Sequence, residues 1–194
     1  LEFRRVLFRS YKEDKVIIPA IYSFLQQDYP RELYDIIVIS DQMQESTNEA
    51  LRQLPVRLLI ADYTDSSKAK AMSLAMNATA DIPYDAVVIM DADNTAGTSF
   101  LSELNPVFQS GARAVQAHRT AKNTNTDIAV LDAASEEINN SIFRSGHIAL
   151  GLSSALIGSG MALEACWFRQ HIHLLETAGE DKEMEALLLK QRIH

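Results

Sequence analysis

The sequence predicts an α/β domain built on a mostly parallel, doubly wound β-sheet, and three observations support this. Short runs rich in β-branched residues, at 35–40 and 86–90, are typical of strands buried on both faces. Segments with helical spacing of apolar residues alternate with such runs, as they do in doubly wound folds. The chain has 194 residues, enough for one domain with a substantial core.

Strands and helices are expected to alternate through the first half. The first helix is expected to open at 11–14, where Asp14 can cap it, and to end near Gln27. The elements that follow are strand 35–40, helix 47–54, strand 56–61, helix 67–78, strand 86–90, helix 98–109 and strand 112–117. Right-handed crossovers would bring the ends of the two buried strands to one edge of the sheet, so that Asp41 and Asp91 face one crevice.

The second half is less regular. One long helix is expected from Asp127 to about Ser145, with one polar and one apolar face. The apolar face consists of Ile128, Leu131, Ile138, Ile142 and Phe143. A loop is expected over 146–160, and a last helix over 182–190.

Composition excludes several classes of protein. The net charge is −8 and there is no basic cluster, which argues against a nucleic-acid partner. A single cysteine rules out an internal disulfide and fits a reducing compartment. No apolar run reaches the length of a membrane span, and no signal peptide is evident.

The first ten residues, LEFRRVLFRS, match no pattern in the rest of the chain. Glu2–Ser10 equals the translation of a sequencing adapter, so we interpret residues 1–10 as an adapter or assembly scar that replaced a lost native first strand. The expected organisation is therefore a scar at 1–10 and an incomplete domain at 11–194. No functional residue is assigned to the scar.

Paired aspartates follow the strand at 86–90 directly. In open α/β sheets, ligands bind beyond the carboxyl ends of the strands. Two carboxylates two residues apart, Asp91 and Asp93, can hold one hard divalent cation, which can bridge a diphosphate. A solvated acidic turn has the same pattern, so Asp-x-Asp alone leaves both interpretations open.

Two further segments are candidates for a site. Gly158 and Gly160 flank Ser159 and allow close approach of the backbone to a ligand. Glu180 and Asp181 lie at a helix N-terminus, where the helix dipole favours ionised carboxylates, although helix capping explains them equally well.

Together these segments resemble glycosyltransferase family 2, the inverting nucleotide-sugar transferases of GT-A fold. The resemblance covers 11–194 and rests on short segments in the family's order. They are YKED at 11–14, VISD at 38–41, SKAKA at 67–71, VIMDADN at 88–94, IGSGMA at 157–162 and GEDKE at 179–183.

The resemblance implies a role for each segment. The residues expected to bind the nucleotide sugar are Tyr11, Glu13, Asp41, Lys70, Asp91 and Asn94. Asp91 and Asp93 would hold Mg²⁺ or Mn²⁺, and Gly158, Ser159 and Gly160 would lie beside the acceptor. Asp181 would be the general base, with Glu180 next to it, because a sugar hydroxyl is a poor nucleophile without one.

The implied reaction moves a sugar from a nucleoside diphosphate, a UDP-sugar by the resemblance, to a hydroxyl of a saccharide or lipid. The chain stops at 191–194, before the Gln-x-x-Arg-Trp motif of many relatives, so 11–194 is expected to be an incomplete, truncated catalytic domain whose activity is in question. Relatives often carry flanking transmembrane helices. The full-length protein is therefore expected at the cytoplasmic face of a membrane, and the fragment alone in the cytoplasm.

Two alternatives remain open at this stage. The segment 91–95 also resembles the Asp-x-Asp-x-Thr motif of haloacid-dehalogenase-like phosphatases, in which Asp91 would be phosphorylated. That motif normally follows the first strand of its domain, whereas several strands are expected before it here. The second alternative is a non-catalytic fragment that binds a nucleotide sugar.

Overall fold

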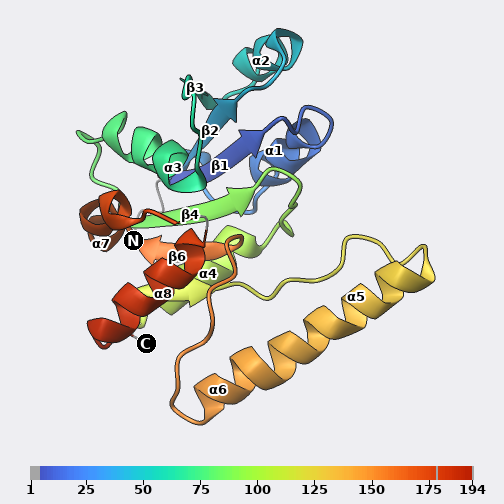
Figure 1. Ribbon diagram of the computed structural model, residues 1–194, viewed down its shortest axis with the longest axis vertical. Coiled ribbons are helices and arrows are strands. Elements are labelled where there is room, and N and C mark those ends of the chain that lie inside the picture. Colours follow the sequence, from blue (N-terminus) through green and yellow to red (C-terminus); the bar gives the residue numbers. More distant parts are fainter. Residues whose placement is uncertain (1–4, 178, 194) are drawn as a thin grey trace.

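A computed structural model describes residues 5–177 and 179–193 and contains one six-stranded sheet flanked by helices (Figure 1). The strands are β1 (Arg5–Tyr11), β2 (Asp35–Asp41), β3 (Arg57–Ala61), β4 (Ala86–Asp91), β5 (Ala114–Gln116) and β6 (Met161–Glu164). Their order is β3-β2-β1-β4-β6-β5. β1 to β4 pair in parallel, and β6 pairs antiparallel with both β4 and β5. The predicted α/β class with a mostly parallel sheet is confirmed.

Helices cover both faces of the sheet. One face packs against α1 (Ile17–Leu25), α2 (Glu45–Arg52) and α4 (Phe100–Gln109). The other packs against α3 (Lys68–Asn77), α7 (Ala165–His171) and α8 (Glu180–Lys190). Short 3₁₀ turns at Arg31–Leu33 and Ile172–Leu174 complete these connections. We call the sheet and these six helices the body.

The first strand comes from a segment that matches no pattern in the rest of the chain. β1 lies between β2 and β4, and Val6, Leu7 and Phe8 are buried, so the described part of the segment set aside as a scar supplies a central strand. Its apolar run fits the core, which explains why the sheet accepts it. The strand position is thus filled, while the origin of 1–10 stays a prediction and residues 1–4 lie outside the described residues.

The start of the first helix was also predicted wrongly. β1 continues to Tyr11, and α1 begins only at Ile17. Asp14 does not cap it, because its Oδ1 accepts a hydrogen bond from the backbone N–H of Gln44 at 2.8 Å. The segment between strand and helix therefore lines the edge of the sheet.

The long helix of the second half differs most from expectation. It runs through α5 (Asp127–Ile138), a π-helical segment (Asn139–Ser145) and α6 (Gly146–Ala149), beyond the predicted end. We call residues 127–149 the arm, which extends away from the sheet in Figure 1. Its predicted apolar face is exposed: Ile128, Leu131, Ile138, Ile142 and Phe143 are 53–73% accessible.

The elements after the arm include two that periodicity did not predict. β6 and α7 follow the loop, and the helix predicted at 182–190 begins two residues earlier as α8. Within the described part of the chain, no helix combines the length and the apolar character needed to cross a membrane.

Candidate active site at the carboxyl ends of the strands

The carboxyl ends of three adjacent parallel strands meet at one edge. Tyr11 of β1 is in register with Asp41 of β2, and Arg9 of β1 is in register with Asp91 of β4. Asp41 and Asp91 therefore lie at the same edge, as predicted, with β1 between them. The residues from 12 to 16 and from 92 to 99 continue from this edge, where ligands of open α/β sheets bind.

Asp41 is fully buried, and only one of its two carboxylate oxygens accepts hydrogen bonds from described residues. Its Oδ2 accepts hydrogen bonds from the Ser66 hydroxyl and, at 3.4 Å, from the Arg9 guanidinium. Its Oδ1 is buried and has no hydrogen-bond partner among the described residues. A buried carboxylate oxygen without a partner is costly.

A cationic and aromatic group lies next to this carboxylate. The Arg9 guanidinium carbon is 5.3 Å, and the Lys12 ammonium 5.0 Å, from the centre of the partly exposed Tyr11 ring. Lys12 has a φ of 55°, and its backbone N–H donates to the Asp41 carbonyl at 3.2 Å. A flat ring beside positive charges suits a nucleobase and its phosphates.

The turn after β4 is held by one serine. The Ser159 hydroxyl accepts from the backbone N–H of Asp91 at 3.0 Å and contacts the Asn94 amide at 3.1 Å. Asn94 also donates to Asp93 Oδ1 at 3.0 Å. These bonds fix the paired aspartates relative to the segment 158–160, while Asp93 stays exposed.

Lys68, the first residue of α3, joins the two halves of the site. Its ammonium lies 2.6 Å from Asp91 Oδ1, 2.5 Å from the Gly158 carbonyl and 3.4 Å from Glu180 Oε1. The Lys68 side chain is only 12% exposed, so its charge is poorly screened. The end of β4 and the start of α8, 89 residues apart in the chain, therefore share one cation.

Gly158 brings the backbone against the acidic start of α8. It has a φ of 73°, which favours glycine. A Cβ placed on it would lie 3.4 Å from the Lys68 ammonium, 3.8 Å from Asp181 Oδ2 and 3.9 Å from Glu180 Oε1. Glu180 and Asp181 thus lie on the same side of the sheet as Asp91. Glu180 is buried and Asp181 is half-buried.

Negative charge accumulates where the turns of β1 and β4 face each other. Burial raises the pKa of the Glu13 carboxyl, and the charges of Asp93 and Asp91 raise it further. Arg9 and Lys68 act in the opposite direction. An acidic cluster that disfavours its own ionisation is an environment in which a cation would be stabilised.

The acidic side chains near Asp91 and Asp93 could hold Mg²⁺ or Mn²⁺ only if the ligand supplied the remaining oxygen atoms. Among residues 5–177 and 179–193, no three acidic, histidine or cysteine side chains converge as a metal-binding group. The carboxylates of Asp91 and Asp93 could supply two hard oxygen ligands, the number with which Mg²⁺ commonly binds a protein when a phosphate completes its shell.

A polar cleft of about 510 Å³ adjoins the paired aspartates. It lies between Asp93, Asn94 and the segment 119–123, with Glu136 of the arm on its wall. The Lys122 ammonium lies 3.3 Å from the Asp93 carbonyl. Its polar lining suits a sugar or a phosphate more than an apolar ligand.

The structure does not bring every expected residue into the site. Lys70 lies at the surface, paired with Asp65 at 3.2 Å, and Lys68 takes the position expected of it. Residues i and i+2 of a helix point in different directions, so the two lysines of SKAKA cannot both face the site. Arg9 was missed because residues 1–10 were set aside, although three arginines in ten residues were a visible signal.

The sheet, with antiparallel β6 between β4 and β5, has the fold of solved glycosyltransferases of the GT-A class. The chain belongs to the family described as glycosyltransferase like family 2, whose model matches residues 6–193. This membership, and the position of Asp91 after a fourth strand, leave the phosphatase interpretation without support.

Solved structures with the same fold have low sequence identity to this chain. S. aureus TarS 1–349 is 12% identical with a TM-score of 0.64, over 91% of this chain and 52% of that one. The mannosyltransferase PcManGT from Pyrobaculum calidifontis, in complex with GDP-Man and Mn²⁺, is 18% identical with a TM-score of 0.63, over 87% and 46%. Glucosyl-3-phosphoglycerate synthase from Mycobacterium tuberculosis, in complex with UDP, is 17% identical with a TM-score of 0.52, over 83% and 56%.

The chain thus spans about half the length of these solved proteins. No curated protein sequence matches it significantly.

Proposed function

We propose that this domain is an inverting glycosyltransferase that moves a sugar from a nucleoside diphosphate, with UDP as the expected nucleotide, to a hydroxyl of a saccharide or lipid. One observation carries the proposal. Lys68 links Asp91 at the end of β4 to Glu180 at the start of α8, so a donor diphosphate at the first and a base at the second would share one site.

The nucleotide would bind at the ends of β1 and β2. Asp41, in register with Tyr11, would mark the base end of the nucleotide site, and the Tyr11 ring would stack on the base. TarS has been solved in complex with UDP-GlcNAc, and PcManGT in complex with GDP-Man. A carboxylate also suits guanine, so the choice of UDP is part of what is tested.

The diphosphate requires positive charge. Asp91 and Asp93 would hold Mg²⁺ or Mn²⁺, with Asn94 fixing their turn. The bound ion would neutralise the departing diphosphate as a Lewis acid. Lys68, which lies between Asp91 and Glu180, would offset part of the negative charge that these carboxylates place beside the diphosphate.

The acceptor hydroxyl would be activated by Asp181. Its carboxylate would take the hydroxyl proton while the oxygen attacks the anomeric carbon and the nucleoside diphosphate leaves with the bonding electron pair. A single displacement of this kind inverts the anomeric centre. Gly158, Ser159 and Gly160 would form the floor beside the acceptor, since Gly158 leaves room next to Asp181 that a side chain would fill.

The experiment uses the whole 194-residue chain and a panel of UDP- and GDP-sugars with and without Mn²⁺. Binding is measured by calorimetry, and turnover by release of the nucleoside diphosphate. Asp181→Asn should reduce turnover at least about 10²-fold, the usual contribution of a general base, and change nucleotide affinity little. Asp81→Asn is the matched control and should leave both unchanged, because it neutralises an exposed carboxylate in the turn before β4, at the opposite end of that strand from the site.

Normal turnover by Asp181→Asn would refute the base assignment. If the unmodified chain binds a nucleotide sugar but neither transfers nor hydrolyses it, the non-catalytic alternative would replace the transferase. The same proposal locates the full-length protein at the cytoplasmic face of a membrane, a placement that rests on the family resemblance.

A further inference from the structure

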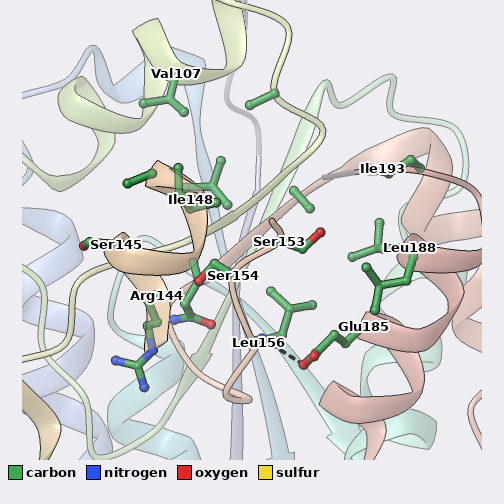
Figure 2. Close-up of a pocket in the computed structure, with 16 residues that line it drawn as sticks. Val107, Arg144, Ser145, Ile148, Ser153, Ser154, Leu156, Glu185, Leu188 and Ile193 are labelled. Carbon is green, nitrogen blue, oxygen red and sulfur yellow. Dashed lines mark hydrogen bonds between the residues drawn. The ribbon is translucent and has the colours of Figure 1, made fainter. Parts of the chain in front are cut away.

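A second cavity, of about 570 Å³, lies between the arm and the body and is unlike the polar cleft (Figure 2). Most of its wall is aliphatic. Large side chains come from Ile148 of α6, Leu156 of the returning loop, Leu188 and Leu189 near the end of α8, and Ile193 after that helix. Its volume lies in the range of ordinary ligand sites.

The charged groups on this wall are already paired within the protein. Arg144 lies 2.9 Å from Glu136 and is 11% exposed. Glu185 accepts from the backbone N–H of Leu156 at 3.2 Å, the dashed contact of Figure 2, and from Lys182 at 2.9 Å. With its charges neutralised internally, the cavity favours an uncharged apolar ligand over an ionic one.

The cavity continues the face of α8 on which the proposed base lies. Asp181, Glu185, Leu188 and Leu189 are spaced i, i+4, i+7 and i+8, so they form one stripe along the helix. Eight residues of helix span about 12 Å. The Leu156 backbone lies on the helix between these ends, bonded to Glu185 and Lys182. An extended ligand chain that passes over this loop would therefore have one end in the cavity and the other near Asp181.

Gln116, which lines the cavity, also fixes the segment 157–159 of the proposed acceptor site. The Gln116 side chain accepts from the backbone N–H of Ile157 at 3.0 Å and donates to the Ser159 carbonyl at 3.0 Å. Leu156 lines the cavity, and Gly158, two residues later, lies against Asp181. One short segment thus separates the apolar space from the acceptor position.

We propose that this cavity binds the hydrocarbon part of a lipid acceptor and presents the hydroxyl end of that lipid to Asp181. The inference rests on the proposed transferase function, and it selects an amphipathic acceptor with an alkyl or isoprenoid chain over a wholly polar saccharide.

The test measures binding of an alkyl glucoside series, from methyl to nonyl, to the complete chain by calorimetry below the micelle concentration. Once the chain is long enough to enter the cavity, each added methylene should tighten binding about fourfold, as for transfer of a CH₂ group out of water. Methyl glucoside should not bind measurably at the same concentrations.

Variants locate the binding site. Ile148→Lys and Leu189→Lys should each weaken nonyl glucoside binding about tenfold or more, because they place a charge in an apolar cavity. Both residues are about half exposed, so the fold should tolerate lysine. The controls are Ile128→Lys on the outer face of the arm and Leu174→Lys on the 3₁₀ turn, two exposed residues outside the cavity wall.

Affinity that does not depend on chain length would overturn the proposal. So would equal weakening by Ile128→Lys, since that would put the ligand on the outer face of the arm. Titration of the same samples with UDP and Mn²⁺ separates the two proposals. Chain-length-dependent binding without nucleotide binding would refute the transferase and the acceptor role, whereas nucleotide binding without chain-length dependence would refute the cavity proposal alone.

Discussion

The body and the arm contain the same kinds of apolar residues, which are buried in the body and exposed in the arm. Ile37 and Ile39 of β2 are 0% exposed, packed under α3 on one face of the sheet. Ile128 and Leu131 of α5 are 73% and 69% exposed. In both segments the apolar residues recur with the period of the secondary structure, so their spacing predicts a strand or a helix. Whether that strand or helix is buried depends on a second layer that packs against it.

Polar contacts, in place of a core, hold the arm. Thr126 caps α5 by accepting from the backbone N–H of Ala129 at 3.1 Å. At its base, Asn140 donates to the Arg119 carbonyl at 2.7 Å, and His118 lies 3.0 Å from Glu137. Apart from Asn140, which is buried, these contacts are exposed and contribute little stability each, so the arm and the body should respond very differently to substitution.

The largest expected effect tests that contrast directly. Ile37→Ala should lower the free energy of unfolding by about 2–5 kcal/mol, because it leaves a cavity in a fully buried layer. Ile128→Ala should change it by less than about 0.5 kcal/mol. Urea denaturation measures both. A loss at Ile128 comparable to that at Ile37 would break the comparison and mean that the arm is covered in solution.

The next prediction compares two lysines of the body, one buried and one exposed. Lys68→Met should lower nucleotide release about 10²-fold, the cost of removing one preorganised electrostatic contact, because Asp91 and Glu180 lose their shared cation. Lys70→Met, which breaks only the exposed pair with Asp65, should change turnover less than about twofold. Equal effects would contradict the assignment of Lys68 to the site.

The smallest effect concerns the pH dependence of stability. The pKa of Glu13 is raised in the folded protein by burial and by Asp93 and Asp91, so its ionisation opposes folding above that pKa. Glu13→Gln should therefore raise the Tm slightly at neutral pH, and the gain should vanish below about pH 4, where the acid is protonated in both states.

Glu45 supplies a control of opposite sign. Hydrogen bonds from Arg52 and Asn48 lower its pKa, so its stabilisation is present above the pKa of the unfolded chain and is lost as the pH falls. Glu45→Gln should lower the Tm at neutral pH and converge with the parent in acid. Thermal melts from pH 3 to 8 follow both variants, and parallel curves for the two would contradict the charge crowding at Glu13.

Much of the site was visible in the sequence because its signals are local. Asp41 and Asp91 end runs of apolar β-branched residues, and parallel strands with right-handed crossovers bring such ends to one edge. Asp181 is proposed as the base only through the family resemblance, since a Glu-Asp pair at a helix start is indistinguishable from a cap. Lys68 was overlooked in favour of Lys70, because the rotation of α3 decides which lysine points inward.

The sequence by itself determined most elements between residues 35 and 109, since strand runs such as 86–91, the cap at Ser67 and breakers such as the proline after Tyr29 act through neighbouring residues. Tertiary structure alone decided that 5–11 is a central strand, that β6 separates β4 from β5, and that the C-terminal end of the arm, at Ile148 and Ala149, borders a cavity. The physical reason is that burial and charge pairing depend on a partner distant in the chain, and one chain segment carries no record of which partner it meets.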